Sequence, residues 1–363
     1  METKVLRAAR GDLLKLVVAG VIIAVAVAWI VDYAGGGKLQ TPGAHQVSGS
    51  DGEPVSGFDR GEIAVALGRG VRRAATLGGS VEAAAMAASW PAPVVVGSPG
   101  SDSERASRMW SMSKVVTMVA LLRSLGWGDE PGDSLSPEVR QALDAAIVRS
   151  ENCPQRRIVL ELQRLNGNSV EGAREAVAAT LHAAGAEGEV ATQVAGPEAS
   201  CLPYLEAQRE IPDPLAPTVL LGTSTWRVAD AARFLDAVGS GVYGKAVADR
   251  VLSEMRIPKE PSTEISPGEY TAASDWGAGR ALAPLHPAYK AGWGGTQQGE
   301  FMVGQMALVE LRGRGQVAVA AVFHPDVQPA VDDPGLTAGP AAIEQVIGAT
   351  AQRPVPSIRL SLW

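Results

Sequence analysis

Trp110-Ser111-Met112-Ser113-Lys114-Val115-Val116 is the most informative stretch of the 363-residue chain. It places a serine three residues before a lysine, at the start of an apolar pattern typical of a buried helix. Residues three apart on a helix share a face, so Ser111 and Lys114 are expected to point into the same space, with Ser113 rotated away. A hydroxyl becomes a nucleophile when a nearby base takes its proton, and a lysine is such a base where burial or positive charge lowers its pKa. Such a pair also arises by chance, but Lys114 alone among the seven lysines has a serine at this offset.

The composition excludes several classes of function. The chain is 46% hydrophobic and 20% charged with a formal net charge of -7, so no nucleic-acid partner is expected. The four histidines stand apart, and the two cysteines are not spaced like a metal clamp, so neither a metal site nor a cofactor is expected. Cys153 and Cys201 either pair in an oxidising compartment or remain unlinked thiols. We expect a monomer.

An apolar segment near the N-terminus predicts a membrane anchor. Residues 13–31 span about 28 Å as a helix, which is close to the thickness of a bilayer core. Positive charge in the preceding tail, residues 1–12, places that tail in the cytoplasm and the rest of the chain outside. A cleaved signal peptide is the alternative, but Asp32 makes the cut site poor. We therefore favour an uncleaved single-pass anchor in the cell membrane, followed by a Gly- and Ser-rich linker over residues 32–59.

The hydrophobic periodicity of residues 60–350 predicts one α+β domain, with a tail over 351–363. Strands are expected near both ends of the domain and helices in the middle, so the two ends should meet in one antiparallel sheet. The expected strands are 80–88, 93–96, 289–292, 301–311 and 316–323. The expected helices are 63–75, 111–124, 137–148, 155–166, 170–184, 225–238, 246–256 and 340–349. Residues 186–218 are expected to be mostly loop.

Two further short motifs follow the serine–lysine pair in order. Ser150-Glu151-Asn152 comes after a predicted helix, where its hydroxyl can relay a proton and its amide can hold a substrate carbonyl and the Lys114 ammonium. Lys290-Ala291-Gly292 begins a predicted strand, where a lysine attracts an anionic substrate and a glycine allows close approach of another backbone. Each tripeptide is common on protein surfaces, and the ordered trio gives them weight.

The ordered set Ser-x-x-Lys, Ser-x-Asn and Lys-x-Gly resembles the motifs of class A β-lactamases and penicillin-binding proteins. Trp276-Gly277, Lys290 and Gly292-Trp293 are similar to a pattern of actinobacterial membrane-anchored serine hydrolases in this superfamily. The resemblance covers residues 60–350 and implies a β-lactamase/transpeptidase-like fold, with helices on the faces of the antiparallel sheet and a helical subdomain.

The resemblance also implies a role for each motif residue. It implies an extracytoplasmic serine hydrolase that forms an acyl-enzyme with a β-lactam or a peptidoglycan-type peptide. The oxyanion hole would be the backbone N–H groups of Ser111 and Trp293. The implied catalytic residues are Ser111 as nucleophile, Lys114 as base, Ser150 as proton relay and Lys290 as positive charge, and the implied substrate-binding residues are Asn152, Gly292 and Trp293.

One expected element of β-lactamases has no counterpart in the sequence. Their Glu-x-x-Leu-Asn motif positions the water that hydrolyses the acyl-enzyme, and Glu198, Glu206 and Glu210 lie in the right region without the Leu-Asn partner. Whether one of them serves, and whether water or an amine accepts the acyl group, stays open. A catalytically degenerate cell-envelope binding or sensing module is the alternative function. A Ser-His-Asp hydrolase is disfavoured because the chain has no Gly-x-Ser-x-Gly.

Overall fold

The computed structural model of the protein describes residues 58–102, 104–190, 194–195, 218–219, 224–260, 277–295, 301–311, 314–326 and 338–351. All of them lie in the larger of two units of the chain, Pro54–Trp363, whereas the unit Met1–Glu53 lies outside the described residues. Within the described ranges, no helix combines the length and apolarity needed to cross a bilayer. The predicted tail 1–12, the anchor 13–31 and nearly all of the linker 32–59 and the tail 351–363 lie outside those ranges.

A five-stranded antiparallel sheet is built from both ends of the domain, as the sequence predicted. Its strand order is β2-β1-β10-β9-β8, so the N-terminal pair of strands adds to the C-terminal three through the pairing of β1 with β10. β8 is therefore an edge strand of this sheet. The strands are β1 (Gly79–Met86), β2 (Val94–Gly97), β8 (Ala288–Gly295), β9 (Phe301–Leu311) and β10 (Gly315–Pro325).

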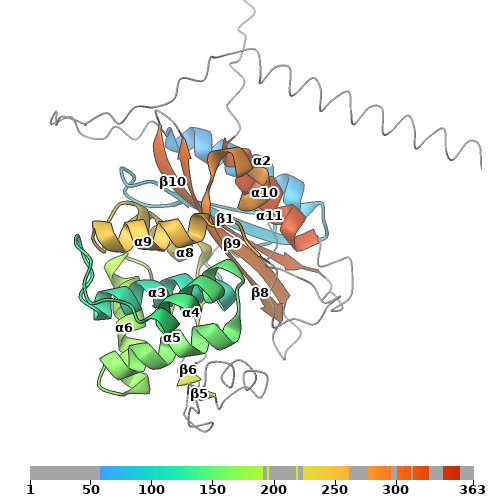
Figure 1. The fold of residues 1–363 in the computed structure, drawn as a ribbon. Coiled ribbons are helices and arrows are strands. Elements are labelled where there is room, and N and C mark those ends of the chain that lie inside the picture. The colour runs from blue at the N-terminus through green and yellow to red at the C-terminus, as the bar shows by residue number, and fades with distance from the viewer. Residues whose placement is uncertain are drawn as a thin grey trace, which may run out of the picture. The chain divides into compact units, whose positions relative to one another are not determined.

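Helices cover both faces of the sheet (Figure 1). α2 (Arg60–Ala75) and α11 (Ala338–Ala351) pack on one face, where Val319 and Phe323 of β10 point into a shared core. Ala320 and Val322 of the same strand point to the opposite face, toward α8 (Val228–Gly239) and the helical part of the domain. This alternation follows from the two-residue period of a strand. The α+β architecture predicted from the sequence is confirmed.

The helical part surrounds α3 (Ser113–Ser124), whose residues from Ser113 to Leu122 are all buried. A helix that is apolar on every side is stable only when other elements enclose it. Side-chain caps begin two of the enclosing helices, where the Ser136 and Ser169 hydroxyls accept backbone N–H bonds at 3.3 and 3.2 Å. The enclosing helices are α4 (Pro137–Val148), α5 (Asn152–Leu165), α6 (Val170–Ala183) and α9 (Lys245–Arg256).

Short elements connect the two parts. A small sheet of order β3-β7-β4 holds the segment that leads into α3, and the Met109 N–H donates to the Ser224 carbonyl oxygen at 2.7 Å. The short strands are β3 (Ser107–Arg108), β4 (Gly188–Glu189), β5 (Val194–Ala195), β6 (Thr218–Val219) and β7 (Thr225–Trp226). The short helices are α10 (Ala278–Ala281) and the 3-10 turns η1 (Trp110–Met112) and η4 (Ala283–Leu285).

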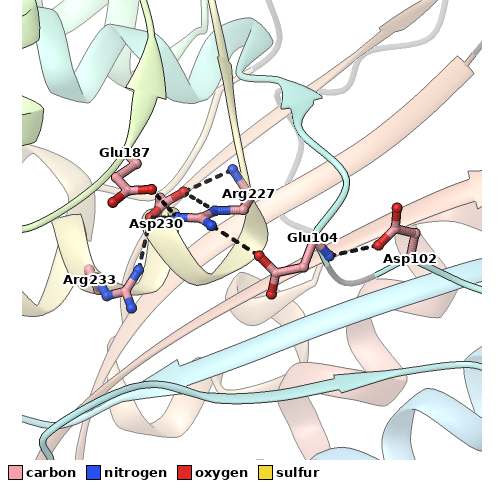
Figure 2. A network of polar contacts seen from close by, with 6 residues as sticks. All are labelled: Asp102, Glu104, Glu187, Arg227, Asp230 and Arg233. Carbon is pink, nitrogen blue, oxygen red and sulfur yellow. Dashed lines mark hydrogen bonds and ion pairs between the residues drawn. The ribbon is translucent and has the colours of Figure 1, made fainter.

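Arg227 ties together the segments that flank this small sheet (Figure 2). Its guanidinium donates to Glu104 at 3.0 Å, to Glu187 at 2.9 Å and to Asp230 at 2.9 Å. The Asp230 side chain is fully buried and also pairs with Arg233 at 3.0 Å. Glu104 precedes β3, Glu187 precedes β4 and Asp230 lies in the first turn of α8, so one side chain joins three chain segments.

Several element boundaries differ from those predicted. The helix expected from Ser111 opens with the 3-10 turn η1, and α-helix begins at Ser113. α5 begins at Asn152 rather than 155, because Pro154 lies in the first turn, where a missing N–H costs no helical hydrogen bond. The helix expected over 225–238 begins at Val228, because Thr225 and Trp226 pair with β3 and β4. β8 is longer than the predicted strand 289–292, because it pairs with β9 along its whole length.

Candidate active site

Ser111 lies in η1, at the N-terminal end of the helical segment that continues as α3. It is half-buried, and a helix N-terminus favours negative charge developing near it. The neighbouring Ser113 turns away, since its hydroxyl donates to the Trp110 carbonyl oxygen at 2.7 Å. Trp110 itself has a φ of 44°, a left-handed conformation that is strained for a bulky residue. The turn that presents Ser111 therefore carries local backbone strain, as residues at functional sites commonly do.

The edge strand β8 lies directly against this turn. A Cβ atom at Gly292 would come within 2.8 Å of the Met109 carbonyl oxygen and 3.0 Å of the Ser111 nitrogen. Two residues further on, a Cβ at Gly294 would come within 2.7 Å of the Trp110 indole. Glycine at these two positions allows the strand to pass at backbone contact distance from Ser111. Gly292, predicted to lie on a substrate-pairing strand, is thus next to the predicted nucleophile.

Lys114 is buried on the first turn of α3 and reaches the segment between α4 and α5. Its Nζ donates to the Asn152 Oδ1 at 2.9 Å and also to the Ser150 carbonyl oxygen. Asn152 is the first residue of α5, so its side chain is held at a helix terminus. The structure therefore joins the first and second sequence motifs through Lys114.

Ser150 receives hydrogen bonds from two lysines. Lys290 Nζ donates to Ser150 Oγ at 2.7 Å and to the Ala291 carbonyl oxygen at 3.1 Å, while Lys114 bonds the Ser150 carbonyl oxygen. Ser150 has a φ of 60°, which places it in the left-handed region in the tight turn between α4 and α5. This turn is also held by Glu151, a buried carboxylate that accepts from Arg149 at 2.8 Å. The Lys290 motif is thereby hydrogen-bonded to the Ser150 motif.

The electrostatics of the site are set by buried positive charge. Burial, followed by the charges of Lys114 and Lys259, holds the pKa of Lys290 well below the usual value for a lysine. Lys259 lies nearby, with its Nζ 4.8 Å from the centre of the Tyr289 ring. Close lysines disfavour one another's protonation, so a neutral amine is easier to form here than in water.

Trp293 is placed differently from the other site candidates. Its indole packs against Phe301, with ring centres 6.1 Å apart, on the face of the sheet that α2 and α11 cover. Lys290 and Gly292 alternate with it and point to the opposite face, toward η1 and Ser150. The side chain of Trp293 therefore points away from Ser111. A part for Trp293 in the site would therefore fall to its backbone, and its role in the oxyanion hole stays a prediction.

Other residues singled out by the sequence lie further away or outside the described ranges. Gly277 has a φ of 60° and packs against Gln305.

Cys153, directly after Asn152, is buried and disulfide-bonded, and Cys201 is the only other cysteine in the chain. No group of three His, Cys, Asp or Glu side chains suited to a metal occurs among the residues that the structure describes. The residues outside the described ranges are Trp276, Glu198, Glu206, Glu210 and Cys201.

Sequence reasoning missed two features beside the site. Lys259 contributes to the low pKa of Lys290, and Trp110, directly before Ser111, lines a neighbouring cavity. Trp110 directly precedes Ser111, so its proximity was readable, but its conformation was not. Lys259 gave no signal, since its approach to Lys290 depends on how α9 packs beside β8.

No protein-family model and no curated protein matches the sequence. Solved structures that match it include β-lactamases, several of them of class A. A mutant of the class A β-lactamase of the last common ancestor of Gram-negative bacteria has a TM-score of 0.49 and 16% identity, covering 79% of this chain and 96% of that one. A β-lactamase from Desulfarculus baarsii has a TM-score of 0.48 and 15% identity, covering 82% and 100%. A β-lactamase from Streptosporangium roseum has a TM-score of 0.47 and 14% identity, covering 77% and 97%. At these identities, function has to be argued from the residues themselves.

Proposed function

We propose that the protein is a membrane-anchored, extracytoplasmic serine hydrolase that acts through an acyl-enzyme on Ser111. The substrate class is a β-lactam or a peptidoglycan-type peptide or amide. One observation carries the proposal: Ser150 receives hydrogen bonds from both Lys114 and Lys290, beside the strand that contacts the Ser111 backbone. Ser150, the two lysine amines and the backbone of the turn that carries Ser111 thus come together from three distant parts of the chain.

In the acylation step, Ser111 Oγ attacks the substrate carbonyl carbon and its proton passes to neutral Lys114. The two N–H groups of that neutral amine already have acceptors in Ser150 and Asn152, which leaves its lone pair to receive the proton. The backbone N–H groups of Ser111 and Trp293 stabilise the oxyanion. When the C–N bond breaks, the Ser150 hydroxyl gives a proton to the leaving nitrogen and is reprotonated by the Lys114 ammonium, which returns Lys114 to its neutral form.

Hydrolysis of the ester by water then restores Ser111 and releases the acid. Glu198, Glu206 and Glu210 are the candidates for activating this water, and the alternative that none of them does so stays open; all three lie outside the described residues. A binding or sensing module of the same fold is the second candidate, favoured by the absence of Glu-x-x-Leu-Asn from the sequence. A module of this kind would acylate without turnover or bind cell-wall fragments without acylation.

Two observations support the extracytoplasmic location. The apolar segment 13–31 with a basic tail before it is typical of an uncleaved anchor whose following domain lies outside. The disulfide at Cys153 is typical of oxidising compartments outside the cytoplasm. A domain tethered there by a linker meets cell-wall peptides and β-lactams, which fits the proposed substrate class.

Covalent labelling tests the proposal. A fluorescent penicillin should label the full-length protein, and peptide mapping should place the adduct on Ser111. Ser111→Ala should abolish the label, whereas Ser113→Ala should retain it, because the Ser113 hydroxyl bonds the Trp110 carbonyl instead of facing Lys114. Equal labelling of wild type and Ser111→Ala would refute the mechanism. Following the label over time separates the two candidate functions, since a hydrolase loses it and a sensing module keeps it.

A further inference from the structure

A cavity of about 260 Å³ lies beside the proposed active site and is lined by Trp110, the residue directly before Ser111. It opens between β3, the edge of the main sheet and the end of β10. Trp110 and Gly294 belong both to this cavity and to the contact between η1 and β8, so the cavity and the site share a wall. Its polar lining residues are Arg105, Ser107, Arg108, Thr225 and His324, and Trp110 and Gly294 also line it.

The lining of this cavity is cationic. It includes two guanidinium groups and an imidazole, and none of the described residues that line it is acidic. Arg108 makes no ion pair within the described part of the chain, and its guanidinium lies 5.5 Å from the centre of the Trp110 ring. Arg105 is partly engaged, because its charge acts on the buried Glu82 next to Asp102. Ser107 and His324 are joined at 3.2 Å between Oγ and Nε2, which holds the imidazole at the cavity.

The direction of the substrate follows from the hydrogen bonds of the proposed site. The leaving nitrogen takes its proton from Ser150, so the leaving half of the substrate lies toward Ser150 and Lys290. The acyl half then extends the other way along β8, from Gly292 toward Gly294. These two residues are separated by about 7 Å along a strand. Groups carried on the acyl half therefore extend toward Trp110 and Gly294, which line the cationic cavity.

We propose that this cavity binds a carboxylate carried by the acyl half of the substrate, with Arg108 as the principal partner. The inference rests on the proposed hydrolase and narrows its substrate to acyl groups that bear a negative charge. A guanidinium forms two parallel hydrogen bonds with a carboxylate, so Arg108 selects both charge and shape. Its contact with Trp110 orients the guanidinium plane beside the turn that carries Ser111.

Two penicillins that differ by one carboxylate provide the test. Carbenicillin is benzylpenicillin with an added carboxylate on its acyl side chain. The rate of covalent acylation of the full chain by each compound is measured by mass spectrometry for wild type, Arg108→Gln and Arg108→Lys. Arg108→Gln should lower the rate with carbenicillin about tenfold and leave the rate with benzylpenicillin within about twofold. Arg108→Lys keeps the charge but loses the second hydrogen bond, so it should recover only part of the carbenicillin rate, and equal melting temperatures confirm that the variants fold.

The outcomes separate this inference from the function on which it rests. If both penicillins acylate Ser111 and Arg108→Gln changes both rates by the same factor, the carboxylate site is wrong while the hydrolase stands. If neither compound acylates the wild type, the proposed hydrolase and the carboxylate site are both overturned. A selective loss with carbenicillin that Arg108→Lys partly reverses supports the site.

Discussion

Lys290 donates a hydrogen bond from Nζ to the Ser150 Oγ at 2.7 Å, although 140 residues separate them in sequence. The bond joins the edge strand of the main sheet to the turn between α4 and α5, so it crosses from the sheet to the helical part of the domain. Both partners have unusual features: Lys290 is buried with a lowered pKa, and Ser150 has a positive φ. A buried lysine and a strained serine that meet in one contact are typical of a functional site rather than of packing.

Replacing Lys290 should therefore slow acylation without unfolding the protein. Lys290→Met keeps the length of the side chain but removes the amine that bonds Ser150, so we expect about a 100-fold lower rate of penicillin labelling, the size of a lost acid–base contribution. Because the lysine is buried at a cost, the melting temperature should not fall. Lys245→Met removes an exposed lysine on α9 and serves as the control. Similar rate losses in the two variants would remove Lys290 from the mechanism.

Gly292 should tolerate no side chain. In Gly292→Ala the new methyl would lie 2.8 Å from the Met109 carbonyl oxygen, so β8 or η1 has to move. We expect a loss of about 1–3 kcal/mol in the free energy of unfolding, as for other overpacked sites, and a large loss of Ser111 labelling. Gly128→Ala is the matched control, because a Cβ there would meet no atom within 4 Å. Chemical denaturation and labelling of both variants measure the effect, and a Gly292→Ala protein with wild-type values would contradict the contact.

Most helices and strands could be predicted from the sequence, but only some of the contacts in the candidate active site could. Spacing of three residues was enough to place Ser111 and Lys114 on one turn, since helical geometry is local. Alternating and helical patterns identified the main sheet and its helices, because each runs for several residues. The two-residue strands β3, β4 and β7 were missed, because so few residues give no periodic signal and are held by tertiary pairing.

Contacts between distant residues set the limit of sequence reasoning. Ser107 and His324 lie 217 positions apart, and neither stands in a motif, so their pairing at the cationic cavity was not predictable. The positive φ of Trp110 was likewise invisible, since tryptophan has no preference for that region. The sequence assigned Lys290 and Ser150 to one active site only because the ordered motifs resemble those of a known family. Their catalytic roles stay predictions.

Arg227 should stabilise the small sheet that leads into Ser111. Arg227→Ala removes the hydrogen bonds to Glu104 and Glu187 and leaves the fully buried Asp230 with Arg233 as its remaining ion-pair partner among the described residues (Figure 2). Losing a partner of a buried charge is costly, so we expect about 2–3 kcal/mol of destabilisation in urea unfolding. Glu104→Gln, which alters a carboxylate that is 73% exposed, should cost under about 1 kcal/mol. Equal losses of unfolding free energy in Arg227→Ala and Glu104→Gln would show that the ion pair with buried Asp230 adds no more stability than the exposed one with Glu104.

The buried carboxyl of Glu82 predicts how stability depends on pH. Burial raises the pKa of Glu82 to about 7, Arg105 opposes this rise and Asp102 adds to it. The folded protein therefore holds this proton more tightly than the unfolded chain does. The resulting stabilisation is full below about pH 4.5 and is lost as the pH rises through about 7. For one group shifted by this much, the loss is on the order of 3 kcal/mol.

Comparing Glu82→Gln with wild type isolates the contribution of Glu82 to the pH dependence of the unfolding free energy. Glutamine mimics the protonated carboxyl, so the variant should match wild type near pH 5 and exceed it in unfolding free energy by on the order of 2–3 kcal/mol near pH 8. Other buried carboxyls with raised pKa values, Asp236 and Glu254, remain in both proteins and cancel in the difference. Glu310→Gln alters an exposed carboxyl on β9 and should follow the wild-type curve at every pH. A difference between Glu82→Gln and wild type that stays constant from pH 5 to 8 would mean that Glu82 remains ionised in the folded protein, because its proton would then not be linked to unfolding.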